Sequence, residues 1–205
     1  MTSSPRDPLA RDPLARDPLA LDARLGWPAD LRVLFERFPR EVWPAHPNLG
    51  QTARFWLQRH DMFRELGGAL NAGTAAFREG EVPAEGFKGW FVPRLRVFLG
   101  ELHGHHQIED DAYFPLFRAA DARLARGFDV LEGDHDAIHH AIETNAERAN
   151  AFLRASDADA ARRAADAYAD SADALLRGLL RHLEDEEDLI VPLILDRGET
   201  DLGIG

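Results

Sequence analysis

The feature that most constrains this chain is an eleven-residue pattern that occurs twice, from His105 to Pro115 and from His182 to Pro192. In each copy a glutamate follows the first histidine by four residues, then come an acidic residue, apolar residues and a final proline. Residues four apart share one face of a helix, so each copy can present an imidazole and a carboxylate to one point. Two such helices facing each other would bring four metal-binding side chains together.

Three further histidines occur on other amphipathic segments. His60 lies between Trp56 and Phe63 at helical spacing, which points its side chain toward the core. His135 and His139 form another pair four residues apart. The alternative interpretation is a set of solvated acidic helix faces that contain histidines by chance, because the chain has 9 His and 36 acidic residues. The repetition of the eleven-residue pattern favours a metal-binding site over that alternative.

Composition narrows the class of protein. The 205 residues, 45% of them hydrophobic, can bury one good core. A net charge of −12 argues against nucleic acid or an anionic membrane as a partner. The chain has no Cys, so a metal site must use His, carboxylate and water, which suit iron, manganese or zinc. No signal-like or membrane-spanning apolar run is present, so we expect a cytoplasmic protein.

The chain divides into four expected parts. Residues 1–23 contain three consecutive Arg-Asp-Pro-Leu-Ala repeats and are predicted to be a flexible tail. Residues 24–48 are predicted to be an N-terminal helical extension, with a short helix after Pro28 that packs on the main body. Residues 49–197 are expected to form the bundle, and residues 198–205 a C-terminal tail.

Hydrophobic spacing predicts four long helices, at about residues 49–71, 89–114, 128–155 and 156–190, with Pro192 closing the last. Residues 72–85 are read as a loop. The buried stripe of the first helix is expected to contain Phe55, Trp56, Phe63, Leu66 and Leu70. The fold class is therefore all-α, an up-down-up-down four-helix bundle with a short additional N-terminal helix.

Seven side chains are expected to point into the bundle. They are His60, His105, Glu109, His135, His139, His182 and Glu186. Five imidazoles and two carboxylates exceed what one tetrahedral zinc needs. They match two octahedral-type ions bridged by both carboxylates, with one coordination position left open.

The remaining histidines are placed outside this set. His103 and His106 lie off the apolar face that carries His105, so they are expected to be outer partners or solvated. His140 is rotated by about 100° from His139 on an ideal helix. The doublet of His105 and His106 leaves the register open by one residue, and the apolar face favours His105.

These motifs resemble the hemerythrin-like family, or HHE cation-binding domain, of the bacterial type over about residues 50–195. The resemblance rests on the HHxxE(E/D) segment ending in Phe-Pro and on the HLxxEE segment ending in Pro. It implies a non-haem centre of two iron ions bridged by Glu109 and Glu186. It assigns His135, His139 and His182 to one iron. It assigns His60 and His105 to the other iron, which keeps the open coordination position.

The resemblance also implies a function. We expect the centre to bind dioxygen, or another diatomic or peroxide ligand, for oxygen or redox sensing, storage or transport. The oxygen carriers have an Asp five residues after their last histidine, whereas this chain has Glu186 at four and Glu187 at five. The alternatives are a di-iron enzyme that scavenges peroxide or nitric oxide, and ferritin-like iron handling. Only Glu132 with His135 fits the Glu-x-x-His pattern that ferritin-like bundles require.

Overall fold

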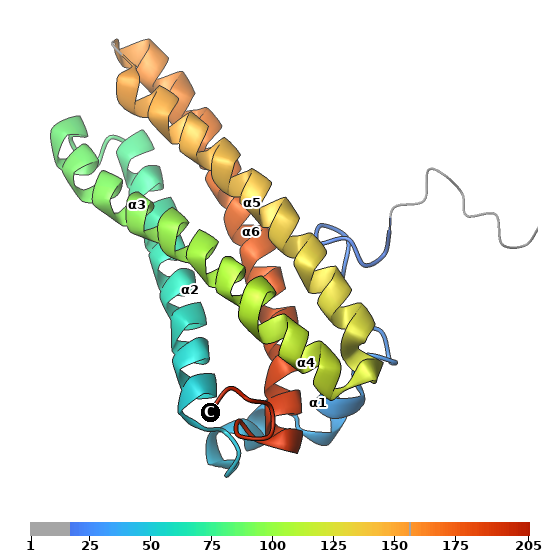
Figure 1. The fold of residues 1–205 in the computed structure, drawn as a ribbon. Coiled ribbons are helices and arrows are strands. Elements are labelled where there is room, and N and C mark those ends of the chain that lie inside the picture. Colours follow the sequence, from blue (N-terminus) through green and yellow to red (C-terminus); the bar gives the residue numbers. More distant parts are fainter. Residues whose placement is uncertain (1–16, 156) are drawn as a thin grey trace, which may run out of the picture.

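Four long helices form the body of the molecule. The computed structural model describes residues 17–155 and 157–205, and the long helices are α2 (Gln51–Arg78), α3 (Ala84–Ile108), α5 (Ala125–Arg154) and α6 (Ala158–Arg197). α2 packs against α3 and α6, and α5 packs against the same two helices, so the four close into a bundle. Their directions alternate along the chain (Figure 1), which confirms the predicted bundle. The described residues contain no β-strand.

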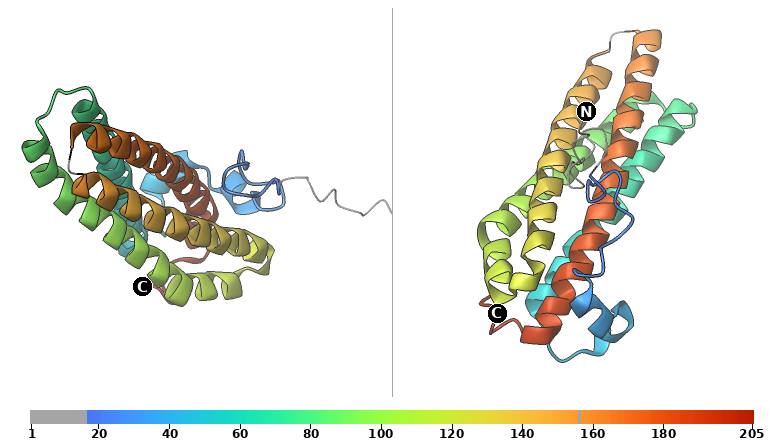
Figure 2. Two further views of the ribbon diagram at one scale, coloured as in Figure 1. Left: turned by 90° about the horizontal axis from the view of Figure 1, so that it is seen from above. Right: turned by 90° about the vertical axis from the view of Figure 1, so that its right-hand side faces the viewer.

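A short N-terminal extension covers one side of α6. It contains α1 (Val33–Arg37) and the 3-10 helix η1 (Arg40–Ala45), and both contact α6. Leu34 and Trp43 are buried there, which explains why so short a helix is stable. Residues 1–16 of the expected flexible tail lie outside the described residues. Residues 17–23 form turns beside α5 and α6 (Figure 2).

The second predicted helix is longer than expected and changes its winding. α3 is followed without a break by a π-helical turn, η2 (Glu109–Tyr113), and by α4 (Phe114–Ala120). In η2 the Phe114 N–H donates to the carbonyl of Glu109, five residues back. Such wide turns are rare and often occur at functional sites. Here the turn begins at Glu109, one of the predicted ligands.

Three boundaries differ from the sequence prediction. The expected loop at residues 72–85 is mostly helical, because α2 continues to Arg78 and α3 begins at Ala84. The third long helix was expected to begin at about residue 128, but α5 begins at Ala125, directly after the 3-10 turn η3 (Ala122–Leu124). The prediction that Pro192 closes the last helix was wrong, since α6 runs through it to Arg197 and ends before Gly198 at φ +84°. A proline removes one backbone donor, and burial of the apolar residues around it outweighs that loss.

The interior consists of two apolar clusters with a polar layer between them. The basal cluster, at the end where both α2 and α5 begin, includes Trp43, Phe117, Leu131 and Ile194. The distal cluster includes Phe63, Phe91, Phe152 and Leu179. α2, α5 and α6 each pass from one cluster to the other, whereas α3 lies in the distal cluster and reaches the basal one through its continuation in α4. The buried histidines and glutamates lie at the crossing. On α5, for example, His135 lies between basal Leu131 and distal Ile138.

One expected core residue is not buried. Phe55 is 62% exposed, whereas Trp56, Phe63 and Leu70 are buried as predicted. Adjacent residues of a helix point about 100° apart, and here Trp56 faces the core while Phe55 faces outward. Within the described residues, no helix combines the length and the apolar character needed to cross a membrane.

Candidate metal centre

Four buried side chains converge between α2, α3, η2 and α6. We call His60, His105, Glu109 and Glu186 the open-side group; one ligand atom from each lies within 4.8 Å of all the others. His60 Nε2 lies 3.0 Å from His105 Nε2, and His105 Nε2 lies 2.9 Å from Glu109 Oε1. His60, Glu109 and Glu186 are buried, while the His105 side chain keeps 10% exposure.

Three imidazoles converge next to this group. We call His106, His135 and His182 the sealed-side group; they come from α3, α5 and α6 and meet the same 4.8 Å criterion. His135 Nε2 lies 3.1 Å from His182 Nε2, and the His106 ring stacks on the His135 ring with centroids 4.1 Å apart. All three side chains are completely or almost completely buried.

The two carboxylates join the groups. Glu109 Oε1 contacts His105, and its Oε2 lies 3.7 Å from His135 Nε2. Glu186 Oε2 lies 3.3 Å from His182 Nε2 and 3.7 Å from His60 Nε2. Each glutamate therefore touches an imidazole of both groups, which is the arrangement that a bridging ligand requires.

Outer acids orient three of the imidazoles. The Nδ1 atoms of His60, His135 and His182 lie 3.0 Å from Glu187, 2.7 Å from Asp110 and 3.4 Å from Asp134, respectively. An acid at Nδ1 holds the proton there and turns Nε2, with its lone pair, toward the centre. This second set of acids gives the imidazoles the orientation and tautomer of metal ligands.

The polar atoms of the centre fit a cation. Both nitrogens of His106 and both oxygens of Glu109 and of Glu186 are buried without a hydrogen-bond partner. Neutral His135 and His182, each donating through Nδ1 to its acid, direct two lone pairs at each other across 3.1 Å. Buried groups of this kind are costly unless something positive lies between them. A metal ion bound by these nitrogens and oxygens removes both costs.

Protonation of the metal-free centre points the same way. Burial lowers the pKa of His105 to about 4 and that of His135 to about 2, so both are neutral at pH 7 and able to bind metal. Burial raises the pKa of Glu109 to about 8. Burial opposes charging of His182, but the nearby carboxylates of Asp134 and Glu186 raise its pKa to about 9. Protons on Glu109 and His182 supply the positive charge that the surrounding atoms require.

The N-terminal extension supplies an arginine to each side. Arg24, whose side chain is completely buried, donates to Asp134 at 2.5 Å and to Asp185 at 2.7 Å. Arg40 donates to Glu187 at 2.8 Å, and Arg64 of α2 donates to the same carboxylate at 2.8 Å. Two of these acids, Asp134 and Glu187, also contact imidazoles of the two groups, those of His182 and His60. The extension is therefore part of the surroundings of the site and not only a cover for α6.

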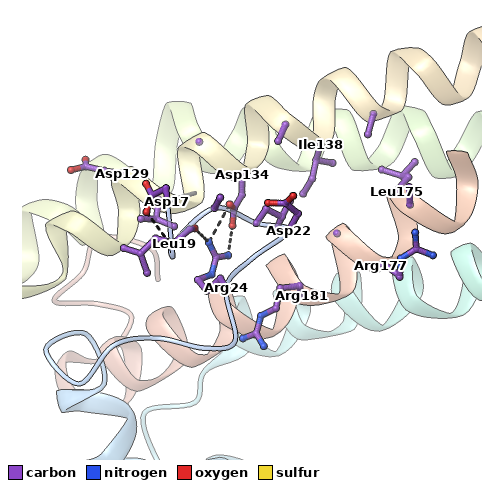
Figure 3. A pocket seen from close by; sticks show the side chains of 18 of the residues that line it. Asp17, Leu19, Asp22, Arg24, Asp129, Asp134, Ile138, Leu175, Arg177 and Arg181 are labelled. Carbon is purple, nitrogen blue, oxygen red and sulfur yellow. Dashed lines mark hydrogen bonds and ion pairs between the residues drawn. The ribbon is translucent and has the colours of Figure 1, made fainter. Parts of the chain in front are cut away.

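Arg24 lies at the bottom of a large surface pocket. The pocket has a volume of about 1060 Å³ and lies between the N-terminal turns, α5 and α6. Figure 3 shows the side chain of Arg24 directed from the N-terminal segment toward Asp134 of α5, while Arg177 and Arg181 line the pocket from α6. Arg181 also pairs with Asp185, the second carboxylate that Arg24 contacts. The wall of this pocket thus shields the sealed-side group behind Asp134.

The structure brings together six of the seven predicted site residues. His60, His105, Glu109 and Glu186 lie in one group, and His135 and His182 in the other. His139 lies in neither group: it is half-buried and its ring lies 4.7 Å from that of exposed His103. His140 is exposed, as expected.

The sequence prediction missed His106. It was expected to be an outer or solvated residue, but it is completely buried and belongs to the sealed-side group. The reason is that α3 packs against both α2 and α5, so two adjacent residues about 100° apart can both face the centre. The signal was present in the doublet before Glu109. Glu132, the residue that fits the ferritin-like pattern, instead pairs with Arg118 at 2.8 Å and its side chain is 42% exposed.

This fold and these two groups define a helical-bundle protein that binds a cation through imidazoles and carboxylates. The profile of the hemerythrin HHE cation-binding domain family matches residues 51–194. The chain therefore belongs to the hemerythrin HHE cation-binding domain family, as the motifs indicated. No curated protein and no solved structure matches it.

Proposed function

We propose that the chain binds two iron ions, one at each group, with Glu109 and Glu186 bridging them. The observation that carries this proposal is that each carboxylate contacts an imidazole on both sides, at 2.9 to 3.7 Å. A single ion would leave one group of buried nitrogens without a partner. Imidazole and carboxylate ligands with open positions suit iron.

The proposed ligand set has the predicted number of residues with one exchange. His106, His135 and His182 bind one ion, while His60 and His105 bind the other, so His106 takes the place that the sequence gave to His139. Both nitrogens of His106 are buried and unpartnered, which a merely structural histidine would not tolerate. The open-side ion then has one imidazole fewer, and the open coordination position belongs to that side.

The open position favours binding of dioxygen or a related small ligand. Two bridged ferrous ions, when bound, supply the electrons and the coordination site for such ligands. The chain supplies the surroundings: Phe63 and Trp56 have ring centroids 5.2 Å and 6.4 Å from that of His105. These rings restrict access of water to the open side. We therefore propose a role in oxygen or redox sensing, storage or transport.

Metal analysis combined with an anaerobic optical titration tests this function. We expect about two iron atoms per chain after expression with iron, and a visible absorption change when dioxygen meets the reduced protein that reverses when oxygen is removed. His140→Ala, at an exposed position, is the control and should behave as the parent does. One metal per chain with zinc preferred over iron would contradict the di-iron proposal. Many turnovers of peroxide or nitric oxide, lost in His60→Ala, would instead identify an enzyme.

A further inference from the structure

A cavity leads from the surface to the open side of the centre. It has a volume of about 450 Å³, lies between α2 and α3, and reaches His105 and Glu109. Its mouth is formed by Phe55 and Ile108, which are 62% and 57% exposed. The metal-binding residues thus form the floor of a pocket with an apolar entrance.

The cavity is much larger than a diatomic ligand requires. A water molecule occupies about 30 Å³ in the liquid, and dioxygen is of similar size. Cavities that bind organic molecules measure roughly 300–1,000 Å³. At about 450 Å³ the pocket falls in the second class. Access of dioxygen alone therefore does not account for the space that α2 and α3 leave between them.

The chemistry of the wall selects an uncharged ligand. Aromatic and aliphatic side chains make up much of it, including Trp56 and Tyr113, whose ring centroids are 5.4 Å apart. Apart from Glu109 at its floor, the charged residues of the wall are Arg59 and Glu101, which pair with each other at 2.6 Å. Neither charge is left to attract an ionic ligand, and exposed apolar side chains at a pocket mouth are typical of binding sites.

Two glycines give the cavity its depth. Gly100 and Gly104 lie one turn apart on α3 and line the pocket, and a Cβ at either position would meet no atom within 4 Å. Gly89, on the same helix, has equally open surroundings, but it does not line this cavity. The space at Gly100 and Gly104 is therefore distinguished by its position above His105 and not by the presence of glycine in a helix.

We propose that this cavity binds an uncharged, mainly apolar organic molecule, such as a small aromatic, beside the open-side ion. The proposal rests on the proposed function for the position of the ion, whereas binding in the cavity depends on its walls. A ligand there lies next to His105 and Glu109 and shields the open position from water. The centre would then respond to the organic molecule as well as to dioxygen.

Calorimetric titration of the iron-loaded full chain with 2-naphthol tests the proposal. Gly104→Leu extends a side chain into the cavity, and Gly89→Leu is the matched control, since both exchanges replace an unobstructed glycine of α3 by a good helix former. We expect Gly104→Leu to weaken 2-naphthol binding at least tenfold and Gly89→Leu to leave it unchanged. The charged analogue 2-naphthoate should bind the parent at least tenfold more weakly than 2-naphthol. Gly100→Leu provides a second blocking variant if Gly104→Leu fails to fold.

Metal content measured on the same samples separates the two proposals. Binding that Gly104→Leu or Gly100→Leu blocks, in a protein with fewer than two irons, would support the cavity and contradict the di-iron centre. Two irons without detectable 2-naphthol binding would overturn the cavity proposal alone. Equal binding in the Gly89→Leu and the blocking variants would also overturn it, because the probe would then bind elsewhere.

Discussion

The two ligand groups use similar side chains in different surroundings. In the open-side group His105 keeps 10% side-chain exposure and borders a cavity of about 450 Å³. In the sealed-side group His106, His135 and His182 are at most 1% exposed. Binding of an external ligand requires a site that is open to the solvent, whereas buried, oriented imidazoles retain a metal ion best. Under the proposed function, the open side would exchange small ligands and the sealed side would anchor the centre.

The arginines around the two sides differ in the same sense. Arg24 is the buried partner of Asp134 behind the sealed side. Behind the open side, Glu187 is shared by Arg40 and Arg64, whose side chains are 38% and 29% exposed. A buried ion pair has no substitute when one partner is removed, but a shared, partly exposed pair does. The sealed side is therefore the more rigidly specified of the two.

The largest expected effect removes the distinction between the sides. Glu109→Ala and Glu186→Ala should each lower metal occupancy at both groups, because each carboxylate contacts imidazoles of both. We expect most of the iron to be lost, as measured by elemental analysis of purified protein. Glu132→Ala, which removes a surface ion pair with Arg118, should keep the parent iron content. Loss of only one iron in the Glu109 variant would show that this carboxylate serves one ion alone.

The next effect should be confined to the sealed side. His106→Ala removes one of its three imidazoles and should lower iron content by about one ion per chain, while His139→Ala should change it little. His106 is completely buried with both nitrogens unpartnered, whereas His139 is half-buried beside His103 and has one buried, unpartnered nitrogen, Nε2. Elemental analysis of the two variants decides whether His106 or His139 is the third imidazole on the sealed side. Greater iron loss in the His139 variant would restore the ligand set predicted from the sequence.

Much of the fold and of the site followed from local spacing. Histidine and glutamate four residues apart share a helix face whatever the tertiary structure, so His105 with Glu109 and His182 with Glu186 were predictable. Hydrophobic periodicity likewise predicted that the four long segments are helices. Boundaries were not, because α6 continues through Pro192 on the strength of buried apolar neighbours that only the assembled bundle provides.

The missed features depend on how helices pack. His106 faces the centre because α3 has a neighbour on each side, which a single-helix projection does not show. Arg24 meets Asp134 and Asp185, which are 110 and 161 residues away, and no local pattern indicates such pairs. The cavity at Phe55 likewise arises from the separation of α2 and α3. Spacing thus predicted which residues come together at the candidate centre better than it predicted what surrounds them.

The third effect compares the arginines of the extension. Arg24→Ala leaves buried Asp134 without its arginine, while Arg181 still pairs with Asp185, and breaking a buried pair typically costs about 3–5 kcal/mol. Arg40→Ala should cost less than about 1 kcal/mol, since Arg40 is 38% exposed and Arg64 still holds Glu187. Urea unfolding of the metal-free proteins measures both. Equal losses would contradict the view that the sealed side is the more rigidly held.

The last effect is the pH dependence of the metal-free protein, to which the buried groups contribute slopes of opposite sign. Burial lowers the pKa of His105 from 6.5 to about 4 and that of His135 from 6.5 to about 2, so the unfolded chain binds two protons that the folded chain resists. Together they outweigh the opposite contribution of Glu109, and stability falls as pH drops below 6.5. The shift of His105 alone corresponds to about 3 kcal/mol.

On the alkaline side His182 and Glu109 act together. Burial disfavours the charged form of His182, but the nearby carboxylates of Asp134 and Glu186 raise its pKa to about 9, and burial raises the pKa of Glu109 to about 8. The folded state then holds protons that the unfolded chain has lost, so stability falls as pH rises, from 4.5 to about 8 for Glu109 and from 6.5 to about 9 for His182. Denaturant unfolding should therefore show a maximum near pH 6.5, and Glu109→Gln should flatten the alkaline limb because an amide does not titrate. Stability that rises steadily to pH 9 would mean that protons do not take the place of metal at Glu109 and His182.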